Sequence, residues 1–135
     1  MSGPACVDSS IVIAHLRGNP AIRAHLEACS EVILPVFVLA ELMLGVRLAA
    51  RSEAEGRGLE AFEKKTRLGL PDRQTAAKYA DIKQSLLQKG TPIPINDLWV
   101  AAYCLQHGLP LAARDQHFNQ VDGLTVLDWF ATPVT

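Results

Sequence analysis

Residues 5–16 read ACVDSSIVIAHL, and this stretch indicates the fold class. The apolar run 5–7 is typical of a short buried strand, and it stops at Asp8. Ser9 or Ser10 can then cap a helix that runs to about Leu16. A strand that passes directly into a helix, with a carboxylate at the junction, is the first unit of an alternating α/β chain.

The rest of the chain repeats this alternation. Helices are expected from Asn19–Pro20, over 36–50, over 52–65, from Asp72 to Lys89, and from Asn96 or Asp97 to His107. Strands are expected at 32–34, weakly near Leu68, at 111–113 and at 124–127. The helix over 36–50 is apolar until Arg47, so we expect it to be buried on nearly every face. The pattern predicts one α/β domain, residues 1–135, with a mostly parallel sheet.

Composition predicts an ordinary globular protein. The chain has 135 residues, of which 49% are hydrophobic and 20% charged, enough to bury a substantial core. The uncharged runs are interrupted by Pro, Gly, Asn and Gln, and none resembles a membrane span or a secretory signal. Cys6, Cys29 and Cys104 lack ligand spacing, so we expect free thiols in a cytoplasmic protein.

Three carboxylates stand alone in long uncharged stretches. Asp8 is the only charged residue in 1–16, Glu41 the only one in 32–46, and Asp97 the only one in 90–113. An isolated carboxylate in an apolar interior costs several kcal/mol unless it is paired, neutralised or metal-bound. Together with Asp115 in the turn-like LAARDQHF, they suggest one site compensated by a cation.

The expected topology places these acids near one another. Asp8 and Asp115 lie at strand ends, Asp97 lies in the first turn of a helix, and Glu41 lies inside the helix after the second strand. Ligands of open α/β sheets bind outside the carboxyl ends of the strands. A pocket made of carboxylates prefers hard cations, so the sequence predicts Mg²⁺ or Mn²⁺ and metal-assisted phosphodiester hydrolysis.

Each acid also has a simpler explanation. Asp8 could cap the next helix, Asp97 could be a first-turn acid, and Asp115 could pair with Arg114. Glu41 has the weakest such explanation, since it has no capping role and positions 37 and 45 carry no Arg or Lys. If the four acids are explained one by one, they need four separate causes, whereas a shared metal site explains all of them with one.

Other residues offer weaker functional signals. His117 follows Asp115 by two positions, and a solvent-facing His at a helix start is commoner than a catalytic base. Trp99 and Tyr103, spaced i, i+4, are expected to pack in the core or an interface. The formal charge of −1 becomes +3 when the four acids are set aside, which permits a phosphate-bearing substrate without demanding one.

The ordered motifs ACVDSSIVIAHL, VFVLAELMLGV, PINDLWVAAYCLQHGLPLAARDQHF and LTVLDW resemble the PIN-domain family, specifically its VapC-type toxins. The resemblance implies a three-layer α/β/α sandwich and assigns metal binding and catalysis to Asp8, Glu41, Asp97 and Asp115. Ser9 matches the small hydroxyl residue that follows the first Asp and supports the ligands. Ala113 departs from the pattern, because that position often carries Thr or Ser, and the change removes a hydroxyl that supports the metal ligands.

The resemblance further implies a Mg²⁺- or Mn²⁺-dependent endoribonuclease, a homodimer, and inhibition by a VapB-like antitoxin that occupies a groove reaching the acids. Two alternatives keep the fold but change the role. One is a catalytically weak module that mainly binds the antitoxin and regulates transcription. The other is a PIN nuclease that acts in RNA processing.

Overall fold

Five short strands pair in parallel to form the central sheet of the computed structural model, which describes residues 2–134. The sheet has the order β3-β2-β1-β4-β5, and each pair of neighbours is parallel. The strands are β1 (Ala5–Val7), β2 (Val32–Pro35), β3 (Arg67–Gly69), β4 (Leu111–Ala112) and β5 (Val126–Leu127). The predicted sheet is therefore confirmed, including the weak strand near Leu68.

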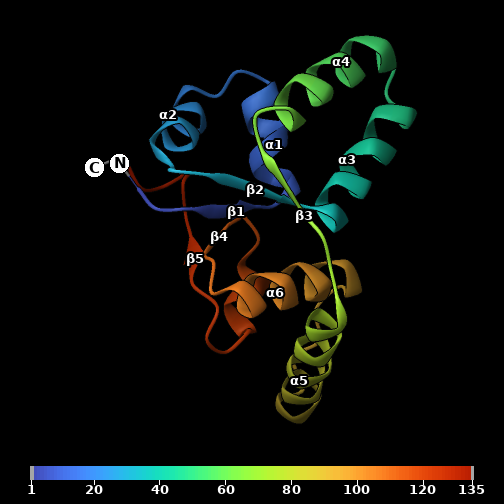
Figure 1. Cartoon of the computed structure of the whole chain (residues 1–135), viewed down its shortest axis with the longest axis vertical. Coiled ribbons are helices and arrows are strands. Elements are labelled where there is room, and N and C mark those ends of the chain that lie inside the picture. Colours follow the sequence, from blue (N-terminus) through green and yellow to red (C-terminus); the bar gives the residue numbers. More distant parts are fainter. Residues whose placement is uncertain (1, 135) are drawn as a thin grey trace.

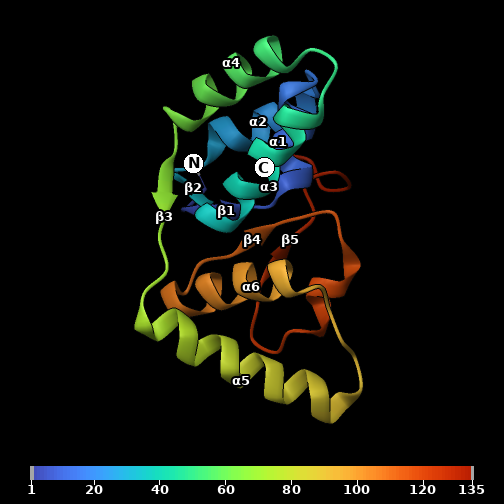
Figure 2. The same cartoon turned by 90° about the vertical axis from the view of Figure 1, so that its right-hand side faces the viewer.

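Helices cover both faces of this sheet, giving the predicted three layers (Figures 1 and 2). One face carries α1 (Ser9–Leu16), α2 (Pro20–Ala28), α3 (Val36–Leu48) and α4 (Ser52–Glu63), and the other carries α5 (Arg73–Lys89) and α6 (Ile95–His107). A short 3₁₀ helix, η1 (Gln116–Gln120), connects β4 to β5. Within residues 2–134, no helix has the length and apolar character that a membrane crossing requires.

The order of the strands creates a switch point between β1 and β4. The chain moves from β1 outward to β2 and β3 over one face, then returns through α5 and α6 to place β4 on the other side of β1. The connections that leave β1 and β4 therefore diverge at the carboxyl ends of these two strands, which is the position where ligands bind in open α/β sheets. Asp8 directly follows β1, and Asp115 lies three residues after β4.

The core is built around β1 and α6. All three residues of β1 are buried, as are the consecutive α6 residues from Val100 to Cys104. A helix that is buried on most faces must be apolar nearly all round, which α6 satisfies with small residues at Ala101 and Ala102. This helix carries Asp97 in its first turn, so its packing also fixes one of the predicted site residues.

A polar network locks α5 against α6 far from Asp97. Asp72 and Thr75 form a capping box at the start of α5, and Gln106 near the end of α6 donates to Asp72 Oδ1 at 2.7 Å. The buried Thr75 hydroxyl in turn donates to Gln106 Oε1. Asp72 therefore caps the start of α5, and Gly90 ends this helix in the left-handed conformation at φ 70°.

Two expectations about helices are wrong. Helix α3 is not buried on nearly every face, because only Val38, Leu39 and Leu42 are buried, and Leu48 is 77% exposed. Apolar composition alone does not distinguish a core face from an apolar face left open at the surface. Helix α6 begins at Ile95, before Asn96 or Asp97, because the N-cap residue is Pro94 in an extended conformation. The strands at 111–113 and 124–127 are also shorter, at two residues each.

Gly69 generates a test of the packing between β3 and α6. A Cβ atom at this position would lie 2.6 Å from Cζ of the buried Tyr103 ring. We expect Gly69→Ala to lower the free energy of unfolding by about 1–3 kcal/mol, because the added methyl group would overlap the buried Tyr103 ring. Urea denaturation measures this change. Gly45→Ala on α3 is the control, since its Cβ would meet no atom within 4 Å and should stabilise the helix by up to about 1 kcal/mol. Equal stabilities of the two variants would contradict the packing.

Candidate metal centre

Asp8 lies at the end of β1 and is 2% exposed. Its backbone N–H donates to Ala112 O at 3.0 Å, which holds the ends of β1 and β4 together. It occupies the N-cap position of α1, yet its side chain makes no capping hydrogen bond. Among the described residues its Oδ1 atom has no hydrogen-bond partner, although that atom is buried. Helix capping therefore does not explain this carboxylate.

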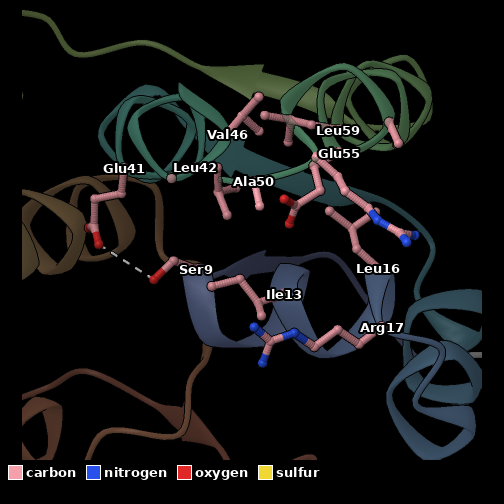
Figure 3. Close-up of a pocket in the computed structure, with 14 residues that line it drawn as sticks. Ser9, Ile13, Leu16, Arg17, Glu41, Leu42, Val46, Ala50, Glu55 and Leu59 are labelled. Atoms are coloured by element: carbon pink, nitrogen blue, oxygen red, sulfur yellow. Dashed lines mark hydrogen bonds between the residues drawn. The ribbon is translucent and has the colours of Figure 1, made fainter. Parts of the chain in front are cut away.

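Glu41 of α3 lies near Asp8 and Asp97. Asn96 of α6 donates its side-chain amide to Glu41 Oε1, and Ser9 of α1 donates its hydroxyl to Glu41 Oε2 at 3.5 Å (Figure 3). Asn96 also contacts Phe37 O at 3.4 Å, so it joins α6 to α3 at two points. One carboxylate is thus held by donors from two other elements, and its orientation is fixed without a basic partner.

Asp97 and Asp115 complete the set. Asp97 is 9% exposed in the first turn of α6, and His117 Nε2 is hydrogen-bonded to its Oδ2 atom. Asp115 is exposed at the N-cap of η1, where its side chain accepts no capping hydrogen bond. No ion pair joins it to Arg114 within residues 2–134, so the pairing considered for these neighbours is absent there.

The four acids come together through Asp97. One ligand atom each from Asp8, Glu41 and Asp97 lie within 4.8 Å of one another, and the same holds for Asp97, Asp115 and His117. The two groups share one residue, and their five residues come from four separate segments. The convergence that sequence and topology predict is present, and Ser9 contacts Glu41.

Burial and mutual repulsion disfavour ionisation of these acids. Burial raises the pKa of Asp8 to about 7, with further increases from the charges of Asp97, Glu41 and Asp115, while the Ser9 backbone amide opposes the shift. Burial also raises the pKa of Glu41 against the hydrogen bond from Asn96. It raises the pKa of Asp97 against the hydrogen bond and charge of His117. The cluster is short of positive charge.

A divalent cation fits this arrangement. The donor set is dominated by carboxylate oxygens, which are the ligands of hard cations such as Mg²⁺ and Mn²⁺. The buried Asp8 Oδ1 has no other partner among the described residues, and a cation would satisfy it. Asn96 and Ser9 hold Glu41 in place, and within residues 2–134 no lysine or arginine forms an ion pair with any of the four acids. The geometry supports a metal site without distinguishing the ion.

Sequence reasoning missed two of these residues. The sequence predicts a solvent-facing His117, but its side chain is only 31% exposed and contacts Asp97. Its separation of 20 positions from Asp97 hides the pair in the sequence. Asn96 was treated as a helix-start residue, whereas its side chain crosses to α3. The remaining signal was its place beside Asp97, which does not by itself indicate a contact with Glu41.

Comparison with known proteins identifies the fold family. The model of the PIN domain matches residues 5–124. The chain belongs to the PIN-domain family. Ribonuclease VapC5 of Mycobacterium tuberculosis is 32% identical over 119 residues, which cover 87% of each chain. Ribonuclease VapC1 of Haemophilus influenzae strain R2866 is 25% identical over 128 residues, covering 91% of this chain and 96% of that protein.

Solved structures agree with this assignment. The DNA-bound VapBC structure from Salmonella typhimurium contains a chain that superposes with a TM-score of 0.88 at 23% identity, covering 96% of this chain and 99% of that one. VapBC-5 from Mycobacterium tuberculosis gives a TM-score of 0.73 at 29% identity, with coverages of 92% and 95%. The resemblance read from the motifs to the PIN-domain family and its VapC members is confirmed.

The raised pKa of Asp8 generates a prediction about stability and pH. Between the unfolded value of 3.8 and the folded value of about 7, the native carboxyl retains a proton that the unfolded chain releases. The free energy of unfolding of the metal-free protein should therefore fall as the pH rises through this window, by about 3 kcal/mol between pH 5 and pH 8 from this group. Urea denaturation in EDTA at pH 5, 6, 7 and 8 measures the slope.

Asp8→Asn is the matched variant, since its amide does not titrate and is nearly the same size. We expect a shallower slope for it, and we expect Mn²⁺ to restore the stability of the original chain at pH 8 because the ion binds the ionised carboxylates. Identical slopes for the two proteins would show that Asp8 does not carry the raised pKa.

Proposed function

We propose that this PIN domain is a metal-dependent endoribonuclease toxin of a type II toxin–antitoxin system. The observation that carries the proposal is the buried Asp8 oxygen, which has no hydrogen-bond partner among residues 2–134 and lies at the switch point of the sheet. Asp8 forms one group with Glu41 and Asp97, and Asp97 forms a second group with Asp115 and His117. The curated relatives named as VapC ribonucleases supply the reaction class, since they match the chain over most of its length. The cytoplasm is the expected location.

Asp8, Glu41, Asp97 and Asp115 would hold Mg²⁺ or Mn²⁺. Bound there, such an ion supplies positive charge for the phosphate oxygens and an activated water for hydrolysis of the RNA phosphodiester bond. The chain's own residues prepare the ligands for this task. Asn96 and Ser9 orient Glu41, and His117 orients Asp97. Because these carboxylates are already ordered, they would lose little rotamer freedom on binding an ion.

We propose that a groove leading away from the acids receives the antitoxin. The groove has a volume of about 780 Å³ and runs between α1 on one side and α3 and α4 on the other (Figure 3). Glu41 and Ser9 lie at one end, and Arg17 and Glu55 lie toward the other (Figure 3). Its walls include Ile13, Leu16, Leu42, Val46 and Leu59. An amphipathic helix could bury its apolar face here and direct its following segment to Glu41.

The solved relatives include complexes named VapBC, which supports a protein partner for this chain. The exposure of α3 that contradicts the sequence expectation is consistent with this role, because an antitoxin would cover part of it. A homodimer, expected from the family resemblance, remains a proposal that light scattering of the purified chain would test.

The proposed activity predicts metal-dependent cleavage of RNA. The purified chain should cut RNA within total bacterial RNA when Mg²⁺ or Mn²⁺ is present, and EDTA should stop the reaction. Mapping the cut ends would identify the preferred sequence. Asp8→Asn should lower kcat by at least about 100-fold while retaining the fold, because it removes one charge from the ligand set. Intact RNA with both ions would contradict the proposal.

Metal titration separates the nuclease from a catalytically weak antitoxin-binding module. We expect calorimetry to detect Mn²⁺ binding by the original chain, and weaker binding by Asp115→Asn, because this acid lies in the second group of ligand atoms. Lys89→Gln is the control, since its ammonium group pairs with Asp122 outside the cluster. Absence of binding at millimolar Mg²⁺ and Mn²⁺ would favour the module.

The groove predicts a separable antitoxin contact. Leu16 lines the groove and is 41% exposed, so Leu16→Lys should weaken the complex with the antitoxin encoded beside this chain by at least about tenfold. RNA cleavage should persist, since Leu16 is outside the acidic cluster. Leu87→Lys on α5 is the control, because Leu87 is 68% exposed on the opposite layer. Equal antitoxin affinities of the two variants would contradict this location.

A further inference from the structure

Arg114 holds its guanidinium group over an aromatic ring beside the acidic cluster. Its Cζ atom lies 3.8 Å from the centroid of the Phe130 ring. Arg114 lies between β4 and Asp115, and Phe130 follows the end of β5 by three residues. These two strands are parallel neighbours, so both residues lie beyond the carboxyl edge of the sheet, where the acids converge.

The backbone of Arg114 is attached to the same elements as the acids. Its N–H donates to the Ser10 hydroxyl at 3.3 Å, and Ser10 lies two positions after Asp8 on α1. The preceding residue, Ala113, donates its N–H to Leu127 O at 3.3 Å. The arginine is therefore anchored between the ends of β1 and β5, and its side chain takes its direction from Phe130.

Arg114 forms no ion pair with a neighbouring acid among the described residues. Within the described part of the chain, no Asp or Glu oxygen lies within 4.0 Å of its side-chain nitrogens, although Asp115 is the next residue. Arg114 is exposed. An arginine beside a cluster of carboxylates would ordinarily be drawn into an ion pair, so the contact with Phe130 keeps its positive charge at the rim.

We propose that Arg114, held over Phe130, binds a phosphate of the RNA strand next to the scissile bond. The inference rests on the proposed ribonuclease function and adds a substrate-positioning residue to it. A guanidinium group that lies over a ring uses its face for that contact, which leaves its in-plane N–H donors free for two phosphate oxygens. The phosphate is the group of RNA that matches this fork, and binding it requires no base sequence.

The Phe130 ring contributes to phosphate binding by ordering the Arg114 side chain. Arginine has several rotatable bonds, and ordering them on substrate binding costs free energy. Phe130 restricts the side chain before RNA arrives, so less of that cost falls on the binding step. A lysine at position 114 would retain the charge but lose the planar fork and most of its fit to the ring.

Steady-state cleavage of an RNA oligonucleotide that spans the mapped cut site tests this role. We expect Arg114→Ala to raise KM roughly tenfold with kcat within about twofold, because phosphate binding is lost equally from the ground and transition states. Arg114→Lys and Phe130→Leu should each raise KM several-fold. Arg73→Ala is the matched control, since this exposed arginine begins α5 beside Asp72, at the end of α6 remote from Asp97.

A binding measurement without metal provides an independent readout. In the Asp8→Asn background with EDTA, fluorescence anisotropy of the same labelled RNA should show weaker binding after Arg114→Ala. The slope of log affinity against log salt should become shallower by about 0.7. Thermal unfolding of each variant establishes that the fold is retained.

Two results would overturn the inference while leaving the nuclease intact. One is cleavage by the original chain with equal KM values for Arg114→Ala and Arg73→Ala. The other is a loss of kcat at unchanged KM, which would place the arginine's effect on the acids instead of the substrate. Unchanged KM in Phe130→Leu would remove the ring from the mechanism. Failure of the original chain to cleave any RNA would instead overturn the proposed function.

Discussion

The structure depends on the burial of a carboxylate at the junction of β1 and α1. Asp8 is 2% exposed, and one of its oxygens lacks a partner among residues 2–134. Burying such a group costs free energy, and the nearby acids raise its pKa further. The fold nevertheless places it where the ends of β1 and β4 meet, held by the hydrogen bond from its backbone to Ala112. The cost is understandable if the native partner is a cation that binds the folded chain and offsets the repulsion.

Contacts between the two helical layers determine the positions of the other acids. Asn96 joins α6 to α3 at Phe37 and Glu41, and the Trp99 ring stacks between Phe37 and Tyr79 at centroid distances of 5.6 and 4.1 Å. The predicted packing role of Trp99 is confirmed. The apolar stack and the polar bridge both connect α3 to α6. Together they maintain the separation between Glu41 and Asp97. A change in this packing would therefore alter the positions of the proposed metal ligands without contacting them.

Much of the fold and the acid set could be predicted because their signals are local or strongly constrained. Short apolar runs followed by capped helices indicate a parallel α/β sheet, and isolated acids such as Asp8 must be compensated somewhere. The partners that orient these acids leave weaker signals, since His117 meets Asp97 only after the chain has folded. The exposed part of α3 was missed for a different reason. An apolar surface that awaits a partner has the same composition as one buried in the core.

The arrangement around the acids separates two kinds of recognition. The apolar groove approaches Glu41 and Ser9 from between α1 and α3, whereas Arg114 and Phe130 lie beyond β4 and β5. A protein that fills the groove can reach the acids without displacing the arginine from its ring. An RNA strand can engage the arginine without burying apolar surface in the groove. Inhibition then requires only that the end of the antitoxin reach the Glu41 side of the cluster. There it would occupy the space that the scissile phosphate needs.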